Sequence, residues 1–157
     1  MLEDGSVYEG TARGDFKETA CEIVFNTSMT GYVEILTDPS YAGQGVVMTY
    51  PMIGNYGISR EDFESERLQP SAFIVHELSS DPSNFRCTDT IENLLKEYNI
   101  PCISGVDTRA VVKKLRESGT MRGVLTSDIG DRERLMDVIK SFRQIDLVGS
   151  VTAQQPK

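Results

Sequence analysis

The sequence is poor in two kinds of side chain that often carry chemistry. Its 157 residues include one histidine, His76, and three cysteines. A serine or threonine needs an activating base to become a nucleophile, and the usual base is histidine. Hydroxyl-based catalysis therefore has a single candidate base. His76 lies inside the apolar stretch AFIVHEL, so a structural role at a strand end is the simpler interpretation.

The three cysteines, Cys21, Cys87 and Cys102, are odd in number, far apart and without a Cys-x-x-Cys pair. This usage indicates neither a disulfide framework nor a zinc site. We expect three reduced thiols in a cytoplasmic protein, packed as small apolar side chains. A reactive thiolate needs a cationic or helix N-terminal setting. Only Cys87, which follows Arg86 and precedes a predicted helix, comes near to one.

Basic residues and long apolar runs are also scarce. The chain has 16 Lys and Arg against 24 Asp and Glu, for a net charge of −8. Nucleic-acid binding depends on clustered cations that displace counterions, so we expect no nucleic-acid partner. Apolar runs such as residues 72–75 are far shorter than the roughly 18 residues of a membrane-spanning helix. We therefore expect no membrane association, and the amino terminus does not resemble a signal peptide.

Two common site motifs are missing as well. Glycines cluster between residues 43 and 57, but no Gly-Lys-Ser/Thr follows them, and the Gly-x-Gly-x-x-Gly spacing is absent. A phosphate-binding loop needs one of these patterns. None of the serines lies in the Gly-x-Ser-x-Gly elbow of many serine hydrolases. The residues alone thus favour a binding or assembly module.

The patterning that is present divides the chain into two halves. In the first half, strands are predicted at residues 20–26, 43–51 and 71–78, with a tight turn at Asp4-Gly5. Apolar residues at helical spacing predict a short helix at residues 32–36, which Asp38-Pro39 ends. In the second half, helices and strands alternate; the helices are predicted at 89–98, 107–119 and 135–142, and the strands at 100–104 and 121–127.

Alternation of this kind predicts a sheet covered by helices, in an α/β or α+β domain. A chain of this length can bury a core of its own. Helical periodicity fades after Phe142. We therefore expect a folded domain over residues 1–143 and a linker over residues 144–157.

Three long stretches carry a resemblance to a known family. They are VFNTSMTGYVEILTDPSY at 24–41, MTYPMIGNYG at 48–57 and ISGVDTRAVVKKLRESGTMRGVL at 103–125. Together they resemble the amino-terminal domain of the small subunit of glutamine-dependent carbamoyl-phosphate synthetases. The resemblance runs from Leu2 to Leu125 and is weaker through the last helix. It implies an α+β fold of the swivelling β/β/α type.

The resemblance also implies a function for the whole enzyme. In that family a second domain, a class I glutamine amidotransferase, hydrolyses glutamine with a Cys-His-Glu triad and sends ammonia through a tunnel to a large subunit. The large subunit, which uses ATP and magnesium, makes carbamoyl phosphate from bicarbonate for pyrimidine and arginine synthesis. The chain would then be an inactive fragment with no cofactor of its own, and its partners would be the large subunit, the amidotransferase domain and glutamine.

Few residue roles follow from the resemblance. Ser40 matches a serine that reaches across the domain boundary to bound glutamine, and Ser28 and Met29 match a segment near the ammonia route. Without the family, Ser40 is simply a turn serine after Asp38-Pro39. Two alternatives remain open: a stand-alone interaction module, and a serine hydrolase that uses Ser28 or Ser40 with His76.

Overall fold

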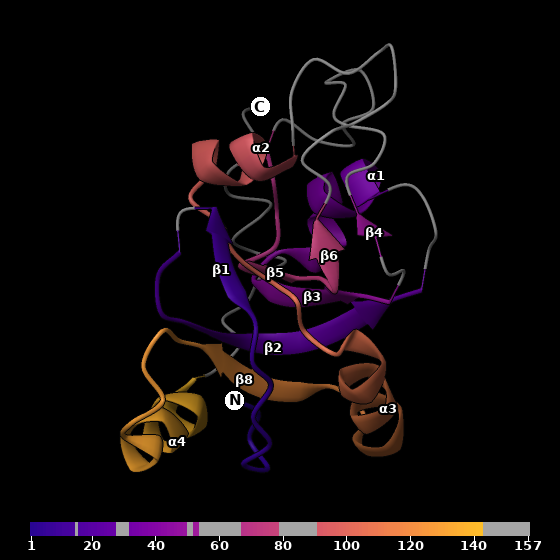
Figure 1. The fold of residues 1–157 in the computed structure, drawn as a ribbon. Coiled ribbons are helices and arrows are strands. Elements are labelled where there is room, and N and C mark those ends of the chain that lie inside the picture. Colours follow the sequence, from indigo (N-terminus) through magenta and orange to yellow (C-terminus); the bar gives the residue numbers. More distant parts are fainter. Residues whose placement is uncertain (15, 28–31, 50–51, 54–66, 79–90, 143–157) are drawn as a thin grey trace, which may run out of the picture.

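The protein is built on a six-stranded mixed sheet (Figure 1). The computed structural model describes residues 1–14, 16–27, 32–49, 52–53, 67–78 and 91–142. Within them the strand order is β1-β7-β5-β3-β2-β8. Neighbours among β2, β3, β5 and β7 pair in parallel, whereas the two outer strands β1 and β8 pair antiparallel. The strands of this sheet are β1 (Thr11–Gly14), β2 (Thr19–Asn26), β3 (Gln44–Met48), β5 (Ala72–Ile74), β7 (Pro101–Ser104) and β8 (Met121–Leu125).

Helices connect the strands of the sheet, and a small strand pair lies apart from it. The pair joins β4 (Met52–Ile53) to β6 (Glu77–Leu78) in parallel. The helical elements are α1 (Tyr32–Thr37), the 3-10 helix η1 (Pro39–Tyr41), α2 (Ile91–Glu97), α3 (Thr108–Ser118) and α4 (Arg132–Ser141). The combination confirms the predicted α+β class, with a strand-rich first half.

The sheet is buried on both faces, and β3 shows how. Successive side chains of a strand point to opposite faces. Val46 and Met48 belong to an apolar cluster with α1 and α2, whereas Val47 belongs to a second cluster with α3. Figure 1 shows α1 and α2 on one side of the strands and α3 on the other. Burial on both faces explains why the strands read as continuous apolar runs.

The ends of α3 follow the predicted signals. The Asp107 side chain accepts a hydrogen bond from the Ala110 backbone N–H at 3.1 Å, as an N-cap residue does. Gly119 ends the helix with φ +76°, a conformation that glycine adopts without strain. α4 uses the same device, because the Asp131 side chain accepts from the Arg134 N–H at 3.0 Å. The sequence prediction missed that second cap and started the helix too late.

Two local differences separate the predicted strands from the observed ones, and one predicted turn is confirmed. The single strand predicted at residues 71–78 divides into β5 and β6, because β5 pairs with β3 and β7 whereas β6 pairs with β4 in the separate two-stranded sheet. The edge strand β1 was not predicted. The Asp4-Gly5 turn is present, with Gly5 at φ +88°, but before it lies only an isolated bridge between Leu2 and Gly123.

Two ion pairs fasten the outer parts of the fold to each other. Lys114 of α3 lies 2.8 Å from Asp4 in the amino-terminal turn. Arg134 of α4 donates to both carboxylate oxygens of Glu18, at 3.0 and 2.8 Å, and Glu18 also accepts from Thr126. The hydrogen bond from Lys114 lowers the pKa of Asp4 to about 2, and those from Arg134 and Thr126 lower the pKa of Glu18 to about 2.

The low pKa of Glu18 predicts a dependence of stability on pH. Its pKa lies below the ordinary value of 4.5, so the ionised carboxylate stabilises the fold at neutral pH. That contribution is lost as the pH falls from the ordinary pKa toward 2. Because the pair is exposed, the effect is modest. We expect Glu18→Gln to lower the urea midpoint at pH 7 and to leave it closer to wild type at pH 3.

A matched control separates this pair from general charge effects. Asp137 is exposed on the same helix and makes no ion pair with another described residue. Asp137→Asn is therefore expected to leave the difference between the pH 7 and pH 3 midpoints unchanged. Equal behaviour of the two variants across this range would show that the pair with Arg134 contributes no stability.

Candidate functional site

Ser40 lies in a tight turn between α1 and β3. Pro39 occupies the first position of η1, where its fixed φ suits a helical turn. The Asp38 side chain caps this turn by accepting from the Ser40 backbone N–H at 2.9 Å. The Ala42 N–H closes it with a bond to the Pro39 carbonyl at 3.1 Å. The local sequence Asp-Pro-Ser thus fixes the backbone of Ser40.

The hydroxyl of Ser40 is presented outward from this fixed backbone. Ser40 is exposed, and its side chain makes no hydrogen bond to another described residue. Beneath it Tyr41 packs against the apolar cluster of α1 and α2, and its hydroxyl accepts from Asn26 Nδ2 at 2.9 Å. The turn is therefore tied to the end of β2, and the Ser40 hydroxyl has no hydrogen-bond partner among the described residues.

The other predicted site residues fall elsewhere. Ser28 and Met29, expected near an ammonia route, lie outside the described residues, and so does Cys87. Of the three residues predicted to bind glutamine or line the ammonia route, the structure positions Ser40 alone.

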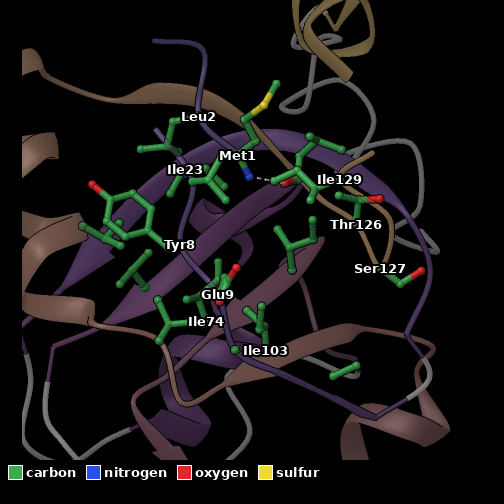
Figure 2. Close-up of a pocket in the computed structure, with 18 of the residues that line it drawn as sticks. Met1, Leu2, Tyr8, Glu9, Ile23, Ile74, Ile103, Thr126, Ser127 and Ile129 are labelled. Atoms are coloured by element: carbon green, nitrogen blue, oxygen red, sulfur yellow. Dashed lines mark hydrogen bonds between the residues drawn. The ribbon is translucent and has the colours of Figure 1, made fainter. Parts of the chain in front are cut away.

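A pocket of about 430 Å³ lies on the other face of the sheet. Figure 2 shows two pocket residues that belong to strands of the sheet, Ile23 and Ile74. Around them lie Tyr8 and Glu9 of the amino-terminal segment and Ile129. Its walls come from the cluster that includes α3, whereas Tyr41 packs in the cluster on the opposite face. Ser40 therefore does not belong to this pocket.

The pocket has little means to catalyse a reaction. Most of its lining is apolar, and of its polar side chains the Thr126 hydroxyl is already engaged by Glu18 at 2.9 Å and by Asp128. Among the described residues, no histidine or cysteine lines it. No sequence pattern pointed to this pocket, because its aliphatic residues, spread from Leu2 to Ile129, are patterned like core.

The buried cysteines are not nucleophiles. Cys21 and Cys102 are fully buried, one in each apolar cluster of the sheet. Burial raises the pKa of both thiols to about 12. A pKa raised in this way disfavours the thiolate, which is the nucleophilic form. The predicted packing role is confirmed for these two.

His76 is not part of a catalytic arrangement with any described residue. It is exposed between β5 and β6, and its backbone carbonyl accepts from the Gly105 N–H at 2.7 Å. Its ring makes no hydrogen bond to a serine or carboxylate among the described residues. A triad needs such bonds to orient and activate its members. The described structure gives the serine-hydrolase alternative no support.

Two further classes of site were searched for in the described part of the chain. It contains no group of three or more His, Cys, Asp and Glu side chains that could hold a metal ion. No helix there has the length and apolar character needed to cross a membrane.

Comparison with known proteins identifies the family. Residues 1–125 match the family described as "Carbamoyl-phosphate synthase small chain, CPSase domain". The chain belongs to this family. The match ends at the last residue of β8, so it covers every strand of the central sheet and leaves out α4.

Individual relatives agree with this assignment. Proteins named carbamoyl phosphate synthase small chain from Caldanaerobacter subterraneus subsp. tengcongensis and Clostridium perfringens are 48% and 47% identical over 155 residues. A third of the same name, from Archaeoglobus fulgidus, is 49% identical over 161 residues. Each alignment covers 99% of this chain but only 42 to 44% of the relative. The chain thus spans less than half the length of these relatives.

The burial of Cys21 and Cys102 predicts that neither reacts in the folded state. In a Cys87→Ser variant these two are the remaining thiols. We expect no reaction with a chromogenic disulfide reagent at pH 8 under native conditions, and two equivalents released in denaturant. Rapid release of even one equivalent from the folded variant would contradict the buried placement.

Proposed function

We propose that this chain is the amino-terminal domain of a carbamoyl-phosphate synthase small chain and that it serves assembly and substrate positioning. The family match over residues 1–125 carries the proposal. It is supported by the lack of a nucleophile with a base among the described residues. Chemistry would then reside in the part of the small chain that the relatives have beyond the length aligned here.

In this proposal the complete enzyme is a glutamine-hydrolysing ligase of the cytoplasm. An amidotransferase domain of the same small chain releases ammonia from glutamine. The large chain, with ATP and magnesium, consumes the ammonia to make carbamoyl phosphate from bicarbonate for pyrimidine and arginine synthesis. Ser28 and Met29 would lie near the ammonia route. The domain described here needs no cofactor for either task.

Ser40 is the residue proposed to touch substrate. A hydroxyl can donate or accept a hydrogen bond without a change of charge. This suits free glutamine, which has an uncharged side-chain amide and charged α-ammonium and α-carboxylate groups. Its exposure and its lack of a hydrogen-bond partner within the described structure support this role. The cap by Asp38 would hold the Ser40 backbone in place before glutamine binds, so little backbone ordering is required on binding.

Replacing Ser40 tests this assignment. In the complete small chain paired with its large chain, Ser40→Ala is expected to raise the KM for glutamine by up to about tenfold, because one hydrogen bond to substrate is lost. The kcat should change little, since the hydroxyl takes no part in bond breaking. Steady-state kinetics of glutamine hydrolysis would measure both values.

Ser141 provides the matched control. It is exposed at the end of α4, and Ser141→Ala removes the same hydroxyl from a place with no proposed ligand. Its KM should equal that of the wild type. A wild-type KM in the Ser40 variant as well would exclude Ser40 from the glutamine site.

The proposal also predicts that the chain alone is inactive. Incubated with glutamine, the 157-residue protein should release no ammonia above the blank, whereas the complete small chain should. Enzymatic detection of ammonia at saturating glutamine would measure this. Release by the short chain that His76→Ala abolishes would instead favour the hydrolase alternative.

A further inference from the structure

A hydrogen bond between Asn26 and Tyr41 ties the turn that contains Ser40 to the central sheet. Asn26 is the last residue of β2, and Tyr41 is the last residue of η1. The Asn26 Nδ2 atom donates to the Tyr41 hydroxyl oxygen at 2.9 Å, although the two residues lie 15 positions apart in the sequence. The bond therefore joins the two ends of the connection that contains α1. We call it the Asn26–Tyr41 bond.

The sheet holds the backbone of Asn26 in place. The Asn26 carbonyl accepts from the Thr49 N–H at 3.1 Å and from the Thr49 hydroxyl at 3.3 Å. Asn26 also lies opposite Met48 in the parallel register of β2 and β3. Both strands are internal to the six-stranded sheet. The Asn26 side chain therefore extends from a fixed backbone.

Tyr41 connects this fixed point to Ser40, its neighbour in the chain. The Tyr41 N–H donates to the Asp38 carbonyl at 3.1 Å, and the Asp38 side chain accepts from the Ser40 N–H at 2.9 Å. Both of these bonds lie within the turn, so they fix its internal shape but not its direction relative to the sheet. The Tyr41 ring leaves the turn and packs against the apolar cluster of α1 and α2.

The direction of the turn needs a contact of this kind. From the turn the chain reaches β3 through Gly43, whose φ is +76°, and glycine restricts the backbone less than other residues do. Apolar packing of the Tyr41 ring is non-directional, whereas a hydrogen bond weakens steeply when its groups are misaligned. The Asn26–Tyr41 bond therefore supplies a direction that the ring packing does not.

The bond lies where its contribution to folding is small. It is only part-buried, and both residues are themselves partly exposed. Water can therefore bond to either group when the other is removed, which limits the cost of leaving a polar group unpaired. The position of a substrate contact matters more, because a displacement of about 1 Å can change a rate by as much as about a hundredfold.

We propose that Asn26 and Tyr41 are positioning residues for glutamine. Through their hydrogen bond, the sheet sets the direction in which the turn presents the Ser40 hydroxyl to the substrate. Supporting hydrogen bonds of this kind hold a functional side chain in its productive geometry. The inference rests on the proposed function, in which Ser40 contacts glutamine. It adds that this contact is oriented from β2 and not by the Asp-Pro-Ser turn alone.

Tyr41→Phe tests the bond and keeps the packed ring. In the complete small chain paired with its large chain, the KM for glutamine should rise about threefold, because the Ser40 hydroxyl is present but less well oriented. The kcat should change little, since neither Asn26 nor Tyr41 takes part in bond breaking. Steady-state kinetics of glutamine hydrolysis would measure both values. Loss of folded protein would instead lower the apparent kcat and leave the KM unchanged.

A double variant shows whether Tyr41 acts through Ser40. Once Ser40→Ala has removed the hydroxyl, the Asn26–Tyr41 bond has nothing left to orient. Ser40→Ala/Tyr41→Phe should therefore have the same KM as Ser40→Ala alone, whereas two independent effects would multiply. Multiplied effects would overturn the proposal, because Tyr41 would then act by a route that does not include Ser40.

Tyr8→Phe is the matched control. Tyr8 is also partly buried, but it packs against the apolar cluster on the other face of the sheet. Its hydroxyl makes no hydrogen bond to another described residue. The variant removes the same atom from a place with no proposed ligand, so its KM and kcat should equal those of the wild type. Circular dichroism and thermal unfolding would show that each variant is folded before kinetics are compared.

The outcomes separate this inference from the function on which it rests. If Ser40→Ala raises the KM while Tyr41→Phe behaves like Tyr8→Phe, the positioning role is overturned and Ser40 remains a glutamine contact. If Ser40→Ala leaves the KM unchanged, the proposed glutamine site fails and the positioning role fails with it. A rise in KM for Tyr41→Phe that disappears in the Ser40→Ala background supports both.

Discussion

The need to bury parallel strands on both faces determines the rest of this structure. β2, β3 and β5 are joined in parallel, and parallel sheets are stable only where both faces are covered. α1 and α2 cover one face and α3 the other, in two separate apolar clusters. The two faces of the sheet can therefore carry different surface features. The turn with Ser40 adjoins the first, and the pocket belongs to the second.

The same constraint explains why the described part of the domain offers few reactive side chains. Residues placed on the central strands, such as Cys21 and Cys102, are enclosed by apolar neighbours, which raises their pKa and removes the reactive form. Groups that can act on a partner lie in turns and on outer helix surfaces. Ser40 is in a turn, and the cations of α3 point away from the sheet. The architecture suits a scaffold whose interacting side chains lie on its surface.

Most of the fold could be predicted from the sequence because the signals that mark its helices and strands are local. Asp107 and Gly119 mark the ends of α3, and apolar spacing marks α2. What was missed depends on contacts between distant residues. β1 is a strand because Thr11–Gly14 pairs with Pro101–Ser104, and its local sequence, TARG, has no strand pattern of its own. Residues 71–78 divide in two because Ala72–Ile74 pairs within the central sheet whereas Glu77–Leu78 pairs with β4.

The candidate site was harder to predict from the sequence, for a different physical reason. Nothing in the local pattern around Ser40 distinguishes a turn serine from a substrate contact, since Asp-Pro-Ser makes the same capped turn in either case. The family resemblance pointed to it, and the structure added that its hydroxyl is exposed.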